Sequence, residues 1–205
     1  MKKLLVDHLP FDISKQQINE SMKENNGKLI VKGVLQRAES KNQNGRIYPK
    51  EILMRESKKY EENFIKENRA LGELDHPDSS VVNLANTSHN IIDTNWRGDD
   101  LMGTVEVLGT PAGNILKELF KAGIKLGISS RGLGSVEAIG EGDAQQVQSD
   151  FELIAFDFVS NPSTHGAFMH PMNESVDRKD VREDGTVCDK WCKSEYIIND
   201  IIRDI

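Results

Sequence analysis

One strand-like run limits the folds open to this chain more than any other feature. Phe151–Ser160 (FELIAFDFVS) carries apolar side chains on both of its alternating faces. A strand with one face in water alternates apolar and polar residues, so a run that is apolar on both faces belongs in the centre of a sheet or in a small barrel. Asp157 is the exception, because an unpaired carboxylate in such a place costs several kcal/mol of desolvation. The run therefore predicts a β-rich core in which Asp157 has a partner.

Length and composition exclude several classes of protein. With 205 residues, of which 37% are hydrophobic, the chain is long enough and apolar enough to bury a core. A formal net charge of −7 argues against a general nucleic-acid binder. No apolar run approaches the roughly 18 residues that span a bilayer, and Asp7 interrupts the apolar start of the chain before a signal peptide can form. We expect a cytoplasmic protein without a membrane or nucleic-acid partner.

Composition also divides the chain into a polar N-terminal segment, 1–27, a body, 28–172, and an acidic tail, 173–205. The tail is rich in charges of both signs, which indicates a linker that hydrates easily and packs poorly. Its last residues differ, because five isoleucines would share one face of a helix behind a Ser194 cap. These are Ile197, Ile198, Ile201, Ile202 and Ile205. We expect that face to bind the body, a second copy of the chain or a scaffold partner.

Capping residues, turn signals and hydrophobic spacing place the other elements. The predicted elements are a short helix after Ser14, a strand over 28–38, a loop over 39–48, a helix opened by Pro49, an antiparallel hairpin of 87–96 and 101–108, a helix from Pro111 to Gly123, and extended chain over 124–129. The helix that begins at Pro111 has one apolar stripe, formed by Ile115, Leu116, Leu119 and Phe120.

The segment Leu71–Asp78 (LGELDHPD) contains the first residue suited to catalysis. Pro77 stiffens the turn and pushes the backbone of His76 toward the extended region, which suits an imidazole that must keep one orientation. Such an imidazole is a general base. The alternative is a loop histidine that is hydrogen-bonded to its acidic neighbours.

The segment Gly127–Ser135 (GISSRGLGS) contains a candidate nucleophile. Its glycines would let a substrate approach the backbone, so we expect an exposed serine hydroxyl and N–H groups that point at an oxyanion. The segment matches neither a phosphate-binding loop nor the strand-turn-helix elbow of hydrolases. An ordinary turn is the alternative.

The sequence leaves three environments open for Asp157. An imidazole N–H would satisfy the acid and fix the tautomer whose other nitrogen accepts a serine proton. The alternatives are a salt bridge with Arg or Lys, or a position at a solvated strand edge. His89 is either a second imidazole in place of Asp157 or a surface histidine on the hairpin, and we favour the surface position.

Metal-based chemistry has little support in the sequence. The spacing of the possible ligands His165, His170, Cys188 and Cys192 fits no common zinc site. Glu73 and Asp75 would share a strand face, so paired carboxylates are conceivable as acid and base, but nothing else supports them. We expect no metal and no cofactor.

Three segments together resemble one family. Gly45–Pro49 (GRIYP), Leu71–Pro77 and Gly127–Ser135 are similar to segments of the prohead core protein proteases of T-even-type tailed phages. The similarity covers about residues 28 to 170, and the last two segments in this order are far more specific than either alone.

The resemblance implies a fold and an activity. The fold would be α+β, a mostly antiparallel β-barrel flanked by helices and shared with herpesvirus assemblins. The activity would be that of a serine endopeptidase, with His76 as base and Ser129, the serine directly after Gly-Ile, as nucleophile. Asp157 is our choice for the third member over His89. Backbone N–H groups of Ser130, Arg131 and Gly132 would bind the oxyanion, and the Arg131 side chain is a further candidate.

The resemblance also implies substrates and a place of action. The family cleaves scaffold and capsid proteins after Glu in Leu/Ile-x-Glu motifs, inside the prohead within the bacterial host cytoplasm. The same rule applied to this chain predicts self-cleavage after Glu20, Glu141 and Glu174, which would remove the head and tail of a zymogen and later inactivate the enzyme. Arg131 and Lys125 are candidates to bind the substrate glutamate. Whether the chain forms a homo-oligomer is left open.

Two rival functions remain at this point. The chain is a non-catalytic scaffold component of the capsid if the three segments only shape turns. It is a metal-dependent hydrolase if His76, His89 and nearby acids bind a metal.

Overall fold

The computed structural model describes residues 3–9, 15–75, 77, 79–124, 126–140, 143–160 and 169–171. The chain divides into two compact units, 1–172 and 173–205, and every described residue belongs to the first. The predicted isoleucine-rich helix therefore lies outside the described residues, as do His165, Cys188 and Cys192.

The described chain forms an α+β fold of three sheets. The strands are β1 (Lys3–Leu9), β2 (Leu29–Arg37), β3 (Arg46–Ile47), β4 (Leu71–Glu73), β5 (Thr87–Arg97), β6 (Asp100–Val107), β7 (Gly127–Gly134), β8 (Val136–Ala138), β9 (Gln145–Val147), β10 (Glu152–Val159) and β11 (Met169–Pro171). The sheets have the orders β1-β7-β10, β11-β2-β6-β5-β4 and β3-β9-β8. Most pairs are antiparallel, and β3 with β9 is parallel. The hydrogen-bonded strands of the described residues do not close into a barrel.

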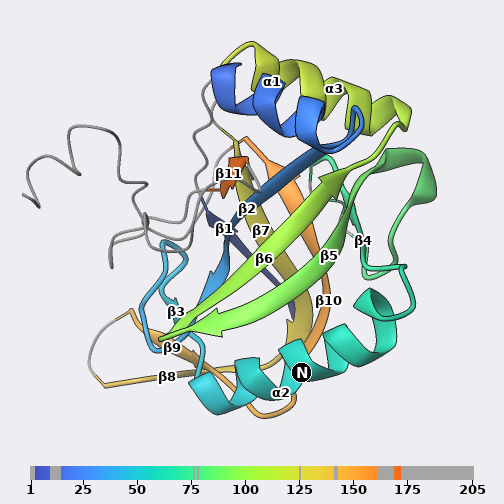
Figure 1. The fold of residues 1–205 in the computed structure, drawn as a ribbon. Coiled ribbons are helices and arrows are strands. Elements are labelled where there is room, and N and C mark those ends of the chain that lie inside the picture. The colour runs from blue at the N-terminus through green and yellow to red at the C-terminus, as the bar shows by residue number, and fades with distance from the viewer. Residues whose placement is uncertain are drawn as a thin grey trace, which may run out of the picture. The chain divides into compact units, whose positions relative to one another are not determined.

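Three α-helices pack against these sheets. They are α1 (Lys15–Glu24), α2 (Lys50–Tyr60) and α3 (Pro111–Lys121), and a π-helical turn, Glu61–Ile65, continues α2. Figure 1 shows α1 and α3 side by side at one end of the five-stranded sheet and α2 at the other end. A short 3₁₀ turn, Leu84–Asn86, lies between β4 and β5.

Most of the predicted elements are confirmed. The strand over 28–38 is β2, the hairpin is β5 and β6, and the helix opened by Pro49 is α2. In α3, Thr110 Oγ1 accepts a hydrogen bond from Gly113 N, and Gly123 has φ +78°, a conformation that ends the helix without strain. The predicted loop over 39–48 contains the two-residue strand β3.

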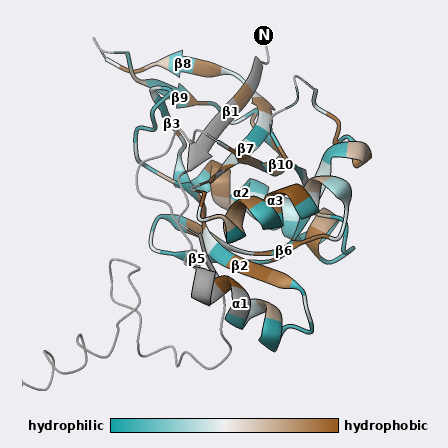
Figure 2. Cartoon of the chain, turned by 90° about the horizontal axis from the view of Figure 1, so that it is seen from above, coloured by the Kyte–Doolittle hydropathy of each residue, from teal (hydrophilic) through white to brown (hydrophobic). Residues whose placement is uncertain are grey.

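The predicted apolar stripe of α3 is partly wrong. Ala112, Leu116 and Phe120, spaced four residues apart, are buried, whereas Ile115 is 55% exposed. Neighbouring helix positions differ by about 100°, so Ile115 turns away when the row through Leu116 faces the sheet. Figure 2 shows hydrophobic and hydrophilic positions on different sides of α3.

The described part of residues 1–27, which is β1, α1 and the turn after α1, packs into the body. β1 pairs with β7 from Lys3↔Gly134 to Leu9↔Ile128, and Leu5 is buried. α1 buries Ile18 and Ser21, and the Ser21 hydroxyl donates to Ile30 O at 2.9 Å. A short helix with few apolar residues is polar on average even when one face is packed, so composition alone did not reveal its place in the core.

The glycine-rich segment is a strand and not a bend. β7 pairs over most of its length with β1 on one side and β10 on the other, and Ser129, Ser130 and Arg131 are at most 1% exposed. The expectation of an exposed serine hydroxyl is therefore wrong. The glycines serve close packing instead: a Cβ on Gly132 would lie 2.7 Å from Glu152 O and from the Phe151 ring.

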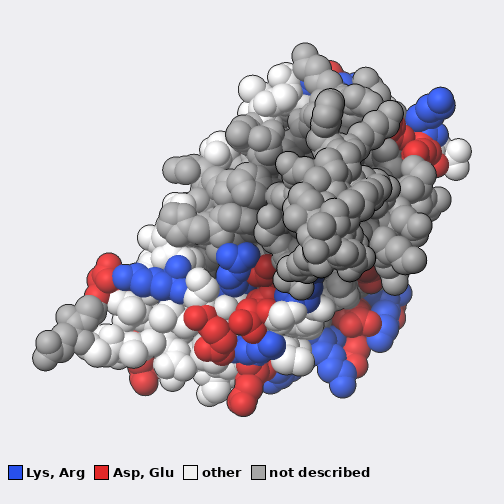
Figure 3. All heavy atoms as spheres, turned by 60° about the vertical axis from the view of Figure 1, so that its left-hand side comes forward, with Lys and Arg blue, Asp and Glu red and all other residues white. Residues whose placement is uncertain are grey.

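Charges of both signs interleave on the described part of the face in Figure 3, which has no large area of one sign. Several charged side chains of the described residues are paired, including Lys28 with Glu106 at 2.8 Å and Arg37 with Asp100 at 2.6 Å. No helix of the described residues is both long and apolar enough to cross a membrane.

Gly132→Ala should lower the free energy of unfolding by about 1–3 kcal/mol, because the added methyl group collides with a backbone carbonyl and a packed ring. Urea denaturation measures the change. Gly109→Ala is the matched control, since a Cβ there meets nothing within 4 Å. Equal stability of the two variants would contradict this packing role.

Candidate active site

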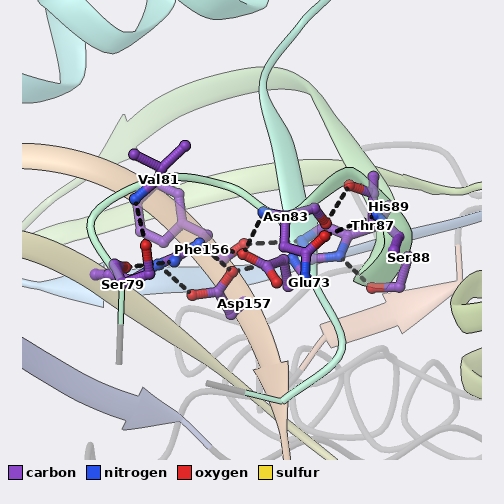
Figure 4. Close-up of polar contacts among 11 residues, drawn as sticks. Glu73, Ser79, Val81, Asn83, Thr87, Ser88, His89, Phe156 and Asp157 are labelled. Atoms are coloured by element: carbon purple, nitrogen blue, oxygen red, sulfur yellow. Dashed lines mark hydrogen bonds and ion pairs between the residues drawn. The ribbon is translucent and has the colours of Figure 1, made fainter. Parts of the chain in front are cut away.

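A buried ion-pair cluster lies where β4, β7 and β10 meet. Its members, Glu73, Arg131 and Asp157, are each 0% exposed. Arg131 Nη2 lies 3.0 Å from Glu73 Oε1, and Arg131 Nε lies 2.9 Å from Asp157 Oδ2. Figure 4 shows Glu73 and Asp157 in this cluster. We call these three residues the Arg131 cluster.

Besides this ion-pair contact, Asp157 accepts two hydrogen bonds through its other carboxylate oxygen. Its Oδ1 accepts from Glu73 N at 2.9 Å and from Arg131 Nη2 at 3.2 Å. The buried position excludes the solvated strand edge considered from the sequence, and an arginine is one partner, as the salt-bridge alternative expected. A carboxylate offers about four lone-pair sites, so these two hydrogen bonds and the ion-pair contact do not exhaust its capacity to accept.

The cluster also binds the chain that follows β4. Arg131 Nη1 donates to Ser79 O at 2.8 Å, and Glu73 Oε1 accepts from Asn83 N at 2.9 Å. Both contacts belong to the loop between β4 and the turn at Leu84–Asn86. Glu73 Oε2 is buried and has no hydrogen-bond partner among the described residues.

Ser129 lies beside this cluster. It is directly opposite Asp157 in the antiparallel register of β7 and β10. Directly opposed residues, and residues two apart on one strand, project from the same face of a sheet. Ser129, Arg131 and Asp157 therefore share a face, whereas Ser130 belongs to the other.

His76 lies outside the described residues, so its contacts are not described, but its neighbours are. Leu74 forms a parallel bridge with Phe158, and Asp75 N donates to Phe158 O at 2.8 Å. Phe158 directly follows Asp157. The chain therefore passes the carboxylate immediately before it reaches position 76.

Glu73 and Asp75 do not share a strand face. β4 ends at Glu73, and Asp75 has φ +69°, a left-handed conformation that breaks the alternation of a strand. Glu73 is buried and Asp75 is exposed. The idea of paired carboxylates at these positions is wrong.

The three residues proposed as oxyanion donors lie inside paired β-structure. Ser130, Arg131 and Gly132 face β1 residues on one side, and β10 residues on the other. Ladder pairing directs backbone N–H groups along the sheet toward the neighbouring strands. The open bend that motivated the assignment is absent from this part of the described chain.

His89 is buried and not on the surface, so the favoured sequence interpretation is wrong. Its exposed fraction is 0%, Nε2 lies 2.9 Å from Phe156 O, and Nδ1 lies 2.9 Å from Ser88 Oγ. A carbonyl only accepts, so Nε2 carries the proton and Ser88 donates to Nδ1. Both nitrogens are thus engaged by structural partners. His89 lies on β5, and the imidazole ring packs edge-on against the ring of Phe158 in the core.

Burial lowers the pKa of His89 from 6.5 to about 4, although the carboxylate of Asp157 acts in the opposite direction.

Glu73 and Arg131 are the residues whose pairing with each other and with Asp157 was missed from the sequence. The only available signal was their presence inside two of the three family-like segments. Among the described residues, no group of three or more His, Cys, Asp or Glu side chains is arranged to hold a metal ion.

The stability of the protein should fall as the pH drops from about 6.5 to about 4, because the unfolded chain then binds a proton that His89 in the folded protein does not. The contribution is fully present above pH 6.5 and amounts to on the order of 3 kcal/mol. Chemical denaturation of the wild type and His89→Gln across this range measures it. Parallel pH curves for the two proteins would contradict the assignment.

Comparisons with known proteins agree with this architecture. Residues 5–177 match the family described as prohead core protein serine protease. The prohead core protein protease of Enterobacteria phage T4 is 36% identical over 146 residues, which is 70% of this chain and 68% of that protein. The solved structure of the bacteriophage T4 capsid assembly protease has a TM-score of 0.68 and 27% identity, and the match covers 78% of this chain and 99% of that one. The family resemblance inferred from three short segments is confirmed, and this chain belongs to the prohead core protein serine proteases.

Proposed function

We propose that the chain is a serine endopeptidase in which Ser129 is the nucleophile, His76 the general base and Asp157 the acid that orients it. One observation carries the proposal: Ser129 and Asp157 lie opposite each other on β7 and β10. The loop that bears His76 is bonded to β10 at the residue next to Asp157. The comparisons support a protease of the prohead, and the roles of the three residues are ours.

The reaction follows from the chemistry of these groups. His76 takes the proton of the Ser129 hydroxyl as the oxygen attacks the scissile carbonyl. The imidazolium that forms is stabilised by Asp157, and it then gives the proton to the leaving amine. Water, activated by the same imidazole, hydrolyses the acyl-enzyme.

Backbone N–H groups of Ser130, Arg131 and Gly132 remain our proposed oxyanion donors, under one condition. β7 is paired on both sides at these residues, so a donor becomes available only where one neighbouring strand is displaced. An oxyanion-hole donor in this fold is therefore coupled to strand pairing, which the sequence did not suggest.

The proposed substrates are phage scaffold and capsid proteins inside the prohead, cleaved after Glu in Leu/Ile-x-Glu motifs. Arg131 is a poor candidate to bind the substrate glutamate, because it is 0% exposed and already binds Glu73, Asp157 and Ser79. Lys125, the other candidate, lies outside the described residues.

We also propose that the sheet β1-β7-β10 and the five-stranded sheet wrap into an incomplete barrel related to that of the assemblins. The bridge from Leu74 to Phe158 joins β4 to β10, and β1 contacts β2 on the opposite side. These two junctions connect the sheets without closing a hydrogen-bonded ring.

Self-cleavage after Glu141 should occur in the folded protein, whereas cleavage after Glu20 should not. Proteases bind substrates in an extended form, but Glu20 lies inside α1 and Ser21 is fully buried. Position 141 falls between β8 and β9, where Ile139 is 39% exposed. Mass spectrometry of an active preparation should therefore find a terminus at Gly142 before one at Ser21. The reverse order would contradict this ranking. Glu141, Gly142 and Glu174 themselves lie outside the described residues.

Ser129→Ala and His76→Ala should each lower the turnover of a Leu-Ala-Glu peptide by several orders of magnitude and leave the circular dichroism spectrum unchanged. Ser135→Ala is the control. Ser135 belongs to the same glycine-rich segment, its hydroxyl binds Asp150, and the variant should keep the wild-type activity. A serine-directed phosphonate should label the wild type and not Ser129→Ala. Inhibition by a chelator, without such labelling, would indicate the metal-dependent alternative and overturn the proposal.

A further inference from the structure

The Arg131 cluster does more than neutralise Asp157. Its two outward contacts, from Arg131 to Ser79 O and from Asn83 N to Glu73, fall in the middle and at the C-terminal end of the loop 74–83. Further bonds hold the ends of this loop: Leu74 N donates to Asn86 O at 3.1 Å, and Thr87 Oγ1 donates to Asn83 O at 3.2 Å. Figure 4 shows Ser79, Asn83 and Thr87 arranged around the buried carboxylates.

These contacts depend on the shape of a guanidinium group. Nη1 of Arg131 donates to Ser79 O in the loop, Nη2 donates to Glu73 on β4 and to Asp157 on β10, and Nε makes an ion-pair contact with Asp157. A lysine ammonium carries the same charge on a single nitrogen and does not reproduce this fork. One buried side chain thus joins β7, β10, β4 and the loop.

We infer that Arg131 and Glu73 are positioning residues that hold the loop 74–83, and with it His76, against the strands that carry Ser129 and Asp157. This inference rests on the proposed function for its catalytic consequence, and on the described contacts for the anchoring itself. The side chain of Arg131 then anchors the loop and binds neither the oxyanion nor a substrate carboxylate, while its backbone N–H stays among the proposed oxyanion donors.

The cluster also has an electrostatic consequence. Two carboxylates and one guanidinium leave one negative charge in the interior. Within the part of the chain that the structure describes, Tyr60 from α2 and His89 from β5 are the other titratable side chains shown to interact electrostatically with the cluster. Burial raises the pKa of Tyr60 and lowers the pKa of His89 to about 4, so both are neutral near pH 7. The remaining negative charge would favour an imidazolium at position 76.

Two variants separate the geometric role from the electrostatic one. Arg131→Lys keeps the charge of the cluster and loses the fork, so kcat for the Leu-Ala-Glu peptide should fall about 100-fold with little change in KM and in the pH profile. Glu73→Gln keeps the shape and removes the negative charge. The acid limb of its kcat/KM profile should therefore move to lower pH, a change that a purely structural residue would not cause.

The matched control is Arg37→Lys. Arg37 makes a similar two-pronged contact with Asp100, at 2.6 Å and 3.1 Å, at the hairpin turn of β5 and β6. This variant should keep the wild-type kcat and pH profile. The inference would be overturned if Arg131→Lys had the wild-type kcat, or if the acid limb of the kcat/KM profile of Glu73→Gln stayed at the wild-type pH.

Hydrogen exchange of the full chain tests the anchoring without any activity. The amides of residues 79–83 should exchange about 10-fold faster in Arg131→Lys than in the wild type, and Arg37→Lys should not change them. Equal exchange in all three proteins would overturn the inference. A wild type that neither cleaves the peptide nor reacts with the phosphonate would refute the proposed function instead, and exchange alone would then decide whether Arg131 anchors the loop.

Discussion

A guanidinium group buried between two carboxylates is the interaction on which the rest of this site depends. Ion pairs without contact to water are costly to assemble, and the loss of one partner typically costs about 3–5 kcal/mol. The fold offsets this cost with geometry: Arg131 makes separate contacts with β4, β10 and the following loop, and a backbone N–H of β4 binds Asp157. The same contacts place the strand of the proposed nucleophile beside the loop of the proposed base.

Strand pairing sets a second constraint, because β7 has neighbours on both sides. A central strand gives Ser129 and Asp157 a defined register, as the two proposed catalytic groups require, because the relative position of such groups has to be held closely. It also buries the serine hydroxyl and directs backbone N–H groups into ladders. The paired state of β7 is therefore ordered, and it leaves the hydroxyl of the proposed nucleophile buried.

The buried histidine illustrates how the same chemistry serves structure. His89 could have been a second catalytic imidazole by residue type, yet both of its nitrogens are held by Ser88 and by a backbone carbonyl. Burial keeps it neutral, and it packs against Phe158 in the core. A histidine becomes catalytic through what its nitrogens face, and residue type alone does not specify that.

The sequence by itself determined the family, the hairpin, the three α-helices and the buried strand with its out-of-place carboxylate, because these depend on local spacing and on short motifs. It did not determine that β1 and α1 contribute Leu5 and Ile18 to the core, that the glycine-rich segment is a strand, or that Asp157 is bound by Arg131. Those facts depend on pairing between segments far apart in the chain: β1 with β7, and β4, β7 and β10 around one cluster. Local patterns report which conformation a segment prefers, and only the tertiary structure decides which distant side chain shares its burial.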